Sequence, residues 1–245
     1  MSLNLMMHCG GQEVGPDQLD VELPPATETF TPVPHVALVD EVRRSLSGHG
    51  HEVIGEAHGL SSDGQRYFGV MEIAPEERNN NGDTGLVVGL RNSHDKSFAA
   101  QLALGHGVFV CDNLAFSGEV RIARRHTRHV RRDLPEVTAR AIGKLMQFRQ
   151  RQESLIEEYK RRSVPGRVAC ELLVRAMEAK AIGCTHIPKV LAEWRRPRHE
   201  EFQPRNAWSM FNAFTEVLKG SSLTSSMTKT TRLHGVFNRT LAITV

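Results

Sequence analysis

The sequence predicts an α+β protein, in which an N-terminal helix and a mostly antiparallel sheet precede a long helix and a helical C-terminal half. Three observations predict this class. A hairpin turn separates two strand-like runs near residue 60, further short apolar runs follow, and apolar residues at helical spacing dominate after residue 133. A chain of 245 residues is long enough to bury a core without disulfides or metals to hold it together. We expect an arm over 1–34, a sheet region over 35–132 and a helical region over 133–245, packed with the sheet as one domain.

Residues 11–34 form an acidic, proline-rich segment that predicts an extended arm, because proline fixes φ and removes backbone donors. We consider two interpretations: a solvated tail, or an arm that covers a basic groove or reaches a neighbouring subunit. All 31 basic residues follow residue 42, whereas seven of the 28 acidic residues precede it. The modest net charge of +3 therefore combines an acidic head with a basic body, and a basic body favours polyanionic partners.

The sheet region is read from its apolar runs and turns. Helical spacing over 36–46 predicts a helix that Gly48 ends. The Ser-Ser-Asp-Gly turn at 61–64 joins predicted strands, and we expect a bend at Gly105–Gly107 between two separate strands. The predicted strands are 51–60, 65–73, 86–90, 98–104 and 108–111, and a flexible loop is expected over 79–83.

The helical region opens with Asp133 as a capping residue and Glu136 three positions later. Apolar spacing predicts one long helix from there to about Arg162, which Pro165-Gly166 ends. Further helices are predicted over 168–182, 185–194, 206–219 and 232–241, and a mobile, low-complexity tail over 221–231.

A basic segment, Glu119–Arg132, lies where the sheet region meets the long helix. Arginine suits phosphate because its planar guanidinium donates two parallel hydrogen bonds. An extended 121–124 or a helical 124–132 would each give a one-sided basic stripe. The alternative is that these arginines face solvent or pair with Glu153, Glu157 and Glu158. The residues that we expect to bind nucleic acid, DNA rather than RNA, are Arg121, Arg124, Arg125, His126, Arg128, His129, Arg131 and Arg132.

The densest polar constellation is Arg91–Ser97, which follows the 86–90 strand. Adjacent Ser, His and Asp are not a triad, since triad members converge in space. We interpret these residues as a turn in which Asn92 or Asp95 bonds local backbone and His94 fixes the neighbouring strand. An unrecognised hydrolase or nuclease would be centred on His94, Asp95 and Asn113.

A metal site is the next alternative. His126 and His129 have i, i+3 spacing, and His94, Asp95, His106 and Cys111 could join them, but no CxxC or HExxH pattern accompanies them. We therefore expect no metal, and the absence of glycine-rich phosphate loops leads us to expect no cofactor.

Two sets of aromatic residues are assigned different roles. Trp208, Phe211 and Phe214 have the helical spacing of core residues. Tyr67 and Phe68 are the better candidates for base stacking, because one of two adjacent strand residues must face away from the core.

The sequence favours a soluble protein of the reducing cytoplasm for three reasons. Its four cysteines are scattered without CxxC spacing, it has no apolar run of membrane-spanning length, and it has no signal-like start. We expect no membrane partner and leave a homo-oligomer open.

Several stretches resemble one known family. Four features are similar to the phage/plasmid-like family catalogued as domain of unknown function 932: the strand at 86–90, the Asn-Ser-His-Asp motif after it, the next apolar strand and the V-C-x-N pattern at 110–113. The segments 117–129 and 206–216 resemble its later motifs. Lys96 departs from it, because the family commonly has glycine there, and the acidic arm lies outside the resemblance. The motif residues matched are Asn92, Ser93, His94, Asp95, Cys111, Asn113, His126 and Thr127.

The resemblance implies a prophage, phage or plasmid origin and no established activity. Our leading interpretation is a non-catalytic, nucleic-acid-binding accessory protein of a mobile element, in one version a single-strand annealing or recombination factor. The alternatives are a protein-binding counter-defence factor that works through its acidic arm, or the unrecognised hydrolase or nuclease above.

Overall fold

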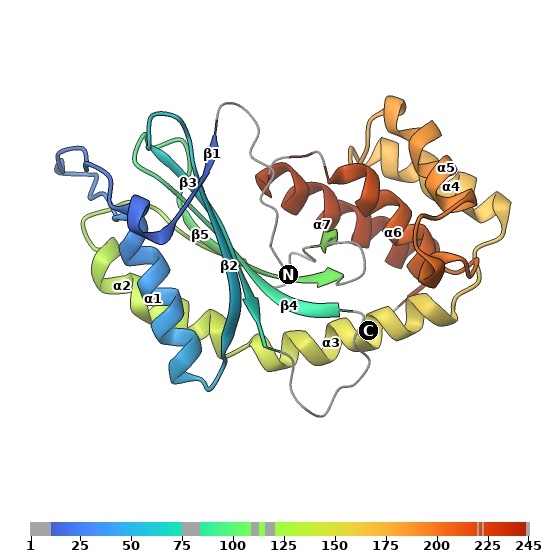
Figure 1. Ribbon diagram of the computed structural model, residues 1–245, viewed down its shortest axis with the longest axis horizontal. Coiled ribbons are helices and arrows are strands. Elements are labelled where there is room, and N and C mark those ends of the chain that lie inside the picture. The colour runs from blue at the N-terminus through green and yellow to red at the C-terminus, as the bar shows by residue number, and fades with distance from the viewer. Residues whose placement is uncertain are drawn as a thin grey trace.

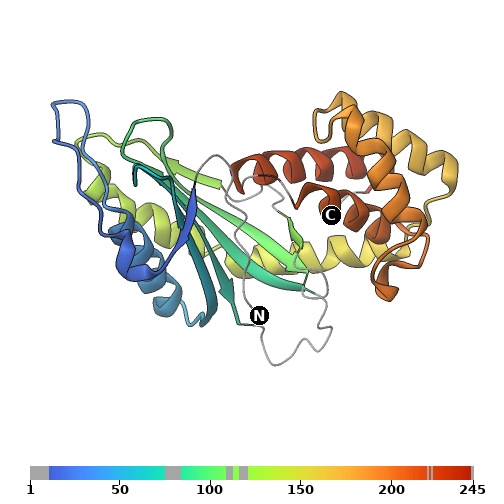
Figure 2. The ribbon, with the colours of Figure 1, turned by 45° about the horizontal axis from the view of Figure 1, so that its top comes forward.

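A computed structural model describes residues 11–74, 84–108, 113–115, 121–219, 221 and 223–243. Figure 1 shows one twisted sheet with α1 (His35–Gly48) and α2 (Val130–Ile142) on one side. A group of helices lies at the opposite end of the molecule, and α3 (Leu145–Arg161) runs from the sheet to that group (Figure 2). The arrangement confirms the predicted α+β class.

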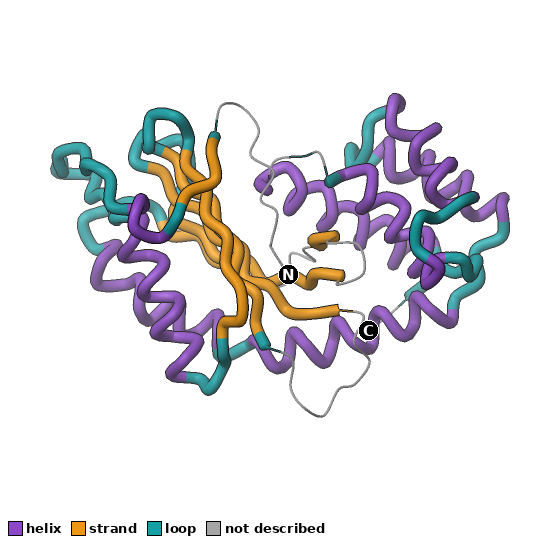
Figure 3. Tube along the Cα trace, in the orientation of Figure 1, coloured by secondary structure: helices purple, strands orange, loops and turns teal. Residues whose placement is uncertain are grey.

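The sheet is antiparallel throughout its described pairings. Strands β1 to β5 lie in chain order, and β6 and β7 both pair with β5 (Figure 3). The seven strands are β1 (Gln12–Val14), β2 (Val53–Leu60), β3 (Arg66–Ile73), β4 (Thr84–Ser93), β5 (Ala100–Val108), β6 (Asn113–Ala115) and β7 (Arg121–Arg124).

The predicted hairpin between β2 and β3 is confirmed, and Gly64 adopts the left-handed backbone that such a turn needs, at φ 68°. Two expectations about the following strands are wrong. Strand β4 continues through Ser93 because its residues Leu86–Ser93 pair with the whole of β3, so the Asn-Ser-His-Asp motif begins inside a strand. Strand β5 continues through Gly105–Gly107 because β4 pairs with it over this stretch, so there is no bend. Of the predicted 108–111 strand, residues 109–111 lie outside the described part of the chain, as does the predicted loop at 79–83.

One face of the sheet carries the first hydrophobic core. Strand alternation places Tyr67, Met71 and Val88 on this face, where they pack against Leu38 and Val42 of α1. Helix α2, from Val130 to Ile142, and the start of α3 contribute to the same core. This packing fixes where the chain leaves β7 and enters α2.

The predicted helix 133–162 is two helices. Helix α2 begins before Asp133, which lies in its first turn, and its last turn closes at Gly143 and Lys144 before α3 starts. The amide of Lys144 bonds the carbonyl of Ala141, three residues back, so the chain tightens and changes direction at this point. Apolar spacing alone does not reveal such a break, because both helices keep the same periodicity.

The remaining helices form a second core at the far end of the molecule. Phe211, Phe214 and Phe237 lie at its centre, and Trp208 is buried beside them, so the predicted core role of the aromatic residues is confirmed. Residues 221–231, predicted to be mobile, mostly belong to α7. Apolar residues later in the same helix are buried in this core, and that packing outweighs a composition rich in serine and threonine. These helices are α4 (Gly166–Glu178), α5 (Ile187–Arg195), α6 (Ala207–Leu218) and α7 (Leu223–Thr240).

The arm packs against the sheet and is not a solvated tail over residues 11–34. Val14 pairs through β1 with β2, and Leu19, Phe30 and Val33 are buried. A short 3-10 helix, Pro16–Leu19, interrupts the otherwise extended chain. Within the described part of the chain, no helix combines the length and apolar character that crossing a bilayer requires.

Candidate functional site

The Asn-Ser-His-Asp motif ties three distant parts of the chain together. The Nδ2 of Asn92 donates to the carbonyl of Val33 at 2.7 Å and approaches Nδ1 of His35 at 3.0 Å. The Nε2 of His94 donates to the same carbonyl at 2.9 Å, and Nε2 of His35 bonds the carbonyl of Gly64 at 3.0 Å. Asn92 and His94 therefore join the end of the arm, the start of α1 and the β2–β3 turn.

The histidines of this cluster are neutral. The His35 and His94 rings stack with centroids 3.9 Å apart and planes 2° apart. Burial, together with the neighbouring His94 and His126 rings, lowers the pKa of His35 to about 4, and burial also lowers the pKa of His94 and His126. Their carbonyl partners place the proton of His35 and of His94 on Nε2. His94 is thus a buried structural donor.

The turn proper begins at His94. Asp95 accepts a hydrogen bond from the backbone amide of Ser97 at 2.9 Å and forms an ion pair with Nε of Arg66 at 2.6 Å. Burial opposes ionisation, but the Ser97 bonds and the Arg66 guanidinium lower the pKa of Asp95 to about 2. The expected local backbone bond is therefore confirmed for Asp95, whereas Asn92 bonds a carbonyl 59 residues earlier.

Lys96, the departure from the family resemblance, has the left-handed backbone conformation. Its φ of 63° is the conformation that glycine adopts most easily, and its Nζ lies 4.7 Å from the centroid of the Phe30 ring. The turn therefore has a backbone that favours glycine at this position, and the lysine side chain contacts the arm.

Four motif residues that were considered for chemistry have different outcomes. The structure does not bring His94 and Asp95 together as an acid–base pair, because His94 is buried on the arm and Asp95 is held by Arg66. Cys111 lies outside the described residues. Asn113 begins β6, but its side chain lies outside the described part.

The basic segment is held at both ends and at its centre. Residues 121–124 form β7, and α2 starts at Val130, so the alternative of a helix over 124–132 is wrong. Between them His126 is buried, its carbonyl accepts a bond from the amide of Thr31 at 3.0 Å, and its ring lies 5.5 Å from that of Phe30. The same arm that covers the motif therefore fixes the middle of the basic segment.

The arginines of the segment divide into two groups. Arg124 is half-buried and forms an ion pair with Asp133, to which Nε of Arg132 also donates at 2.9 Å. Arg125, Arg128, Arg131 and Arg132 are exposed. The side chain of Arg121 lies outside the described part.

The acidic partners differ from those considered in the sequence. Glu157 and Glu158 pair within α3 and its end, with Lys160, Arg161 and Arg162. Asp133 is the partner that sequence reasoning missed, because its position before a helix was interpreted as a cap.

Of the histidines considered as metal ligands, His94 and His126 lie in the buried cluster described above, but His129 and His106 lie elsewhere. His129 is exposed beside Arg128, whose Nε donates to it at 2.9 Å, whereas His106 is buried at the other end of the sheet near Trp208 and His234. Over the described ranges, no group of three or more His, Cys, Asp or Glu side chains has the geometry to hold a metal ion.

The two candidate stacking residues point to opposite faces. Tyr67 is buried, and its hydroxyl lies 3.0 Å from Nδ1 of His58. Phe68 is only partly buried on the other face, with its ring centroid 5.5 Å from that of Phe98. The expectation that one of this pair faces away from the core is confirmed, and Phe68 is that residue.

Comparison with family models finds one match, described as "Domain of unknown function (DUF932)", over residues 24–238. Comparison with curated proteins finds no match, and comparison with solved structures finds none. The matched range starts inside the arm. It therefore includes residues 30–35, which contact both the motif and the basic segment but lay outside the resemblance noted in the sequence.

Proposed function

This chain belongs to the family of the domain of unknown function DUF932, and from its own residues we propose that it binds nucleic acid through the phosphate-binding segment, Arg125–Arg132. One observation carries the proposal: Arg125, Arg128, Arg131 and Arg132 are exposed together on a short stretch of chain whose buried residues fix it in place. Such a stretch presents guanidinium groups at set positions.

The charge balance of the segment supports an anionic partner. Asp133 is the only carboxylate found against these arginines among the described ion pairs, and it is shared between Arg124 and Arg132. Repulsion among the remaining guanidinium groups is relieved when phosphates approach and release their counterions. Arginine contacts of this kind position a phosphate backbone and carry little sequence information.

The Asn-Ser-His-Asp motif supports the proposal because it holds the arm, and the arm in turn holds the basic segment in place. Asn92 and His94 hold Val33, the arm carries Thr31 to the carbonyl of His126, and Nη2 of Arg131 donates to the carbonyl of Pro32 at 3.1 Å. His126 lies between Arg125 and Arg128, so these contacts fix the backbone from which both arginine side chains extend.

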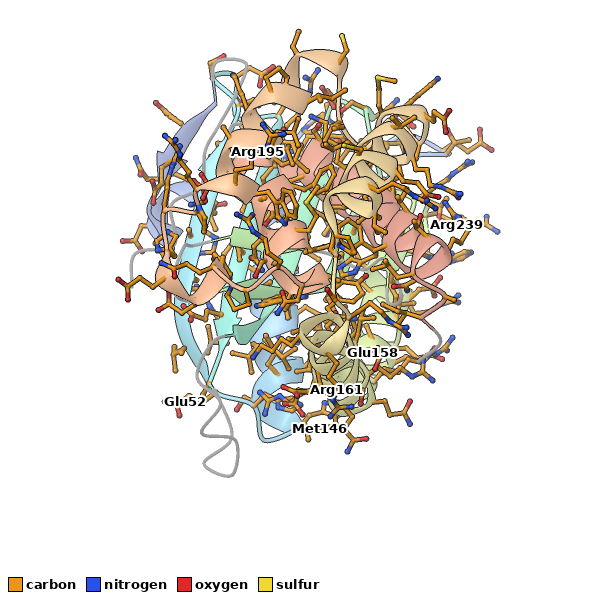
Figure 4. All side chains as sticks on the ribbon, turned by 90° about the vertical axis from the view of Figure 1, so that its right-hand side faces the viewer. Glu52, Met146, Glu158, Arg161, Arg195 and Arg239 are labelled. Atoms are coloured by element: carbon orange, nitrogen blue, oxygen red, sulfur yellow. The ribbon has the colours of Figure 1, made fainter. Side chains whose placement is uncertain are left out.

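The test is fluorescence anisotropy with labelled single- and double-stranded DNA and RNA at two salt concentrations. The variant Arg125→Ala/Arg128→Ala/Arg132→Ala removes three exposed charges and spares Arg131, which bonds the arm. A matched control, Arg161→Ala/Arg195→Ala/Arg239→Ala, removes three exposed arginines from the opposite end of the molecule (Figure 4).

We expect the wild-type protein to bind DNA, and the first variant to lose about tenfold or more in affinity at low salt. The dependence of log K on log salt should fall by about two to three, since each phosphate contact contributes about 0.7 to 0.9. The control should bind like wild type. No binding by the wild-type protein at micromolar concentration, or equal losses in both variants, would refute the proposal.

A further inference from the structure

The face of the sheet opposite α1 and α2 carries two aromatic residues that belong to neither hydrophobic core. Phe68 and Phe98 are partly exposed, whereas the neighbouring Tyr67 is fully buried in the core. A single partly exposed ring is ordinary, but two rings side by side form an apolar patch, which is the more informative observation.

The two rings form a cluster with an arginine. Their centroids are 5.5 Å apart at an interplanar angle of 44°, and Cζ of Arg91 lies 4.9 Å from the centroid of Phe98. A planar guanidinium over a ring, beside a second ring, presents flat surfaces of the kind on which bases stack.

Strand register connects this cluster to the phosphate-binding segment. Phe68 pairs with Arg91, Arg91 with Gln101 and Gln101 with Ala123, so one row of the same face crosses β3, β4 and β5 and ends on β7. Arg124 pairs with Ala100, two residues after Phe98. The chain therefore leaves β7 and enters the phosphate-binding segment from the row of the sheet that carries Phe68 and Arg91.

We propose that Phe68, Arg91 and Phe98 form a base-stacking site that makes single-stranded nucleic acid the ligand of the phosphate-binding segment. This inference rests on the proposed function and narrows its substrate class. A phosphate-binding segment alone does not distinguish one strand from two. Stacking on side chains does, because duplex bases are already stacked on one another and paired, whereas the bases of a single strand are free to lie on a ring.

The test compares an oligonucleotide carrying 2-aminopurine, alone and in a duplex, in binding to Phe68→Ala, Phe98→Ala and wild-type protein. We expect each substitution to weaken single-strand binding about tenfold, to reduce the quenching of 2-aminopurine and to leave the salt dependence unchanged. Phe68→Trp and Phe98→Trp should restore binding, which separates stacking from a loss of folding. Ile54→Ala, which removes an apolar side chain that is 51% exposed on β2, is the matched control and should bind like wild type.

The two proposals fail in different ways. Wild-type affinity in Phe68→Ala and Phe98→Ala, together with a loss in the triple arginine variant, would overturn the stacking site and leave phosphate binding in place. Preference of the wild-type protein for the duplex would also overturn the stacking site. No binding of any nucleic acid would overturn both.

Discussion

His106 makes the stability of this protein sensitive to mild acid. The ring lies on β5, fully enclosed, with centroids 6.1 Å from Trp208 of α6 and 5.8 Å from His234 of α7. Neither ring nitrogen has a hydrogen-bond partner of good geometry among the described residues. Burial lowers the pKa of His106 to about 4, against a weaker opposing effect of the Gln152 side chain.

The direction of the pH effect follows from where each state takes up its proton. In the unfolded chain the pKa of the imidazole is close to 6.5, so below that pH the unfolded state is protonated while the folded ring stays neutral until about pH 4. The stability that depends on neutral His106 is therefore fully present above pH 6.5 and is lost as the pH falls. Between pH 7 and pH 4.5 this one group lowers the free energy of unfolding by about 2–3 kcal/mol. That is a large part of the roughly 5–15 kcal/mol that holds a typical domain folded.

The assay is urea unfolding followed by far-UV circular dichroism between pH 7 and pH 4.5, for wild type, His106→Leu and His129→Gln. At pH 7 we expect His106→Leu to be close to wild type in stability, because an apolar side chain replaces unpaired nitrogens. The difference in free energy of unfolding between His106→Leu and wild type should shift in favour of the variant by about 2–3 kcal/mol between pH 7 and pH 4.5. The exposed His129 serves as the control and should follow wild type. Parallel pH profiles for wild type and His106→Leu would refute the reasoning, since both proteins carry the same carboxylates and differ only at residue 106.

Three further substitutions test the packing. Asn92→Ala removes the bonds to Val33 and His35, so it should lower the free energy of urea unfolding by about 2–3 kcal/mol and speed proteolysis of the arm. An unchanged cleavage rate would contradict the role of Asn92 in holding the arm. Gly69→Ala should cost about 2 kcal/mol or more in thermal unfolding, because its Cβ would lie 2.0 Å from the Tyr67 hydroxyl, whereas Gly48→Ala has open space and should be neutral or stabilising; similar effects at both positions would contradict this. Asn206→Ala removes the side-chain cap of α6 and should cost about 1 kcal/mol by the same measurement; no loss would show that the cap is dispensable.

The parts of the fold that depend on local patterns could be predicted from the sequence. The turn at 61–64, the helix after Asn206 and the burial of Phe211 and Phe214 each follow from a few neighbouring residues. The continuous β5 could not be predicted, because its glycines favour a bend until a long β4 pairs with them. The helical start of α7 depends on a core whose other residues lie elsewhere in the chain.

The candidate site shows the same division. Exposure of Arg125 and Arg128 follows from their charge. Strand alternation also predicts that one of the adjacent residues Tyr67 and Phe68 faces away from the core, and that residue is Phe68. Nothing in the spacing of the sequence indicates that Asn92 would bond Val33 or that His35 would stack on His94. Such contacts depend on the register of the sheet and the position of the arm, which only the folded chain defines.

The way the arm is fastened also constrains the order in which the protein is completed during synthesis. The bonds that hold residues 31–33 come from Asn92, His94, His126 and Arg131, which are separated from the arm by as many as 99 positions. The ribosome makes the arm before these partners. Asn92 and His94 follow with β4, whereas His126 and Arg131 follow only after β7. Contacts across such long separations are slow to form. The arm therefore stays accessible to proteases and chaperones until the sheet region is made, and its contacts are complete only when the start of α2 has left the ribosome.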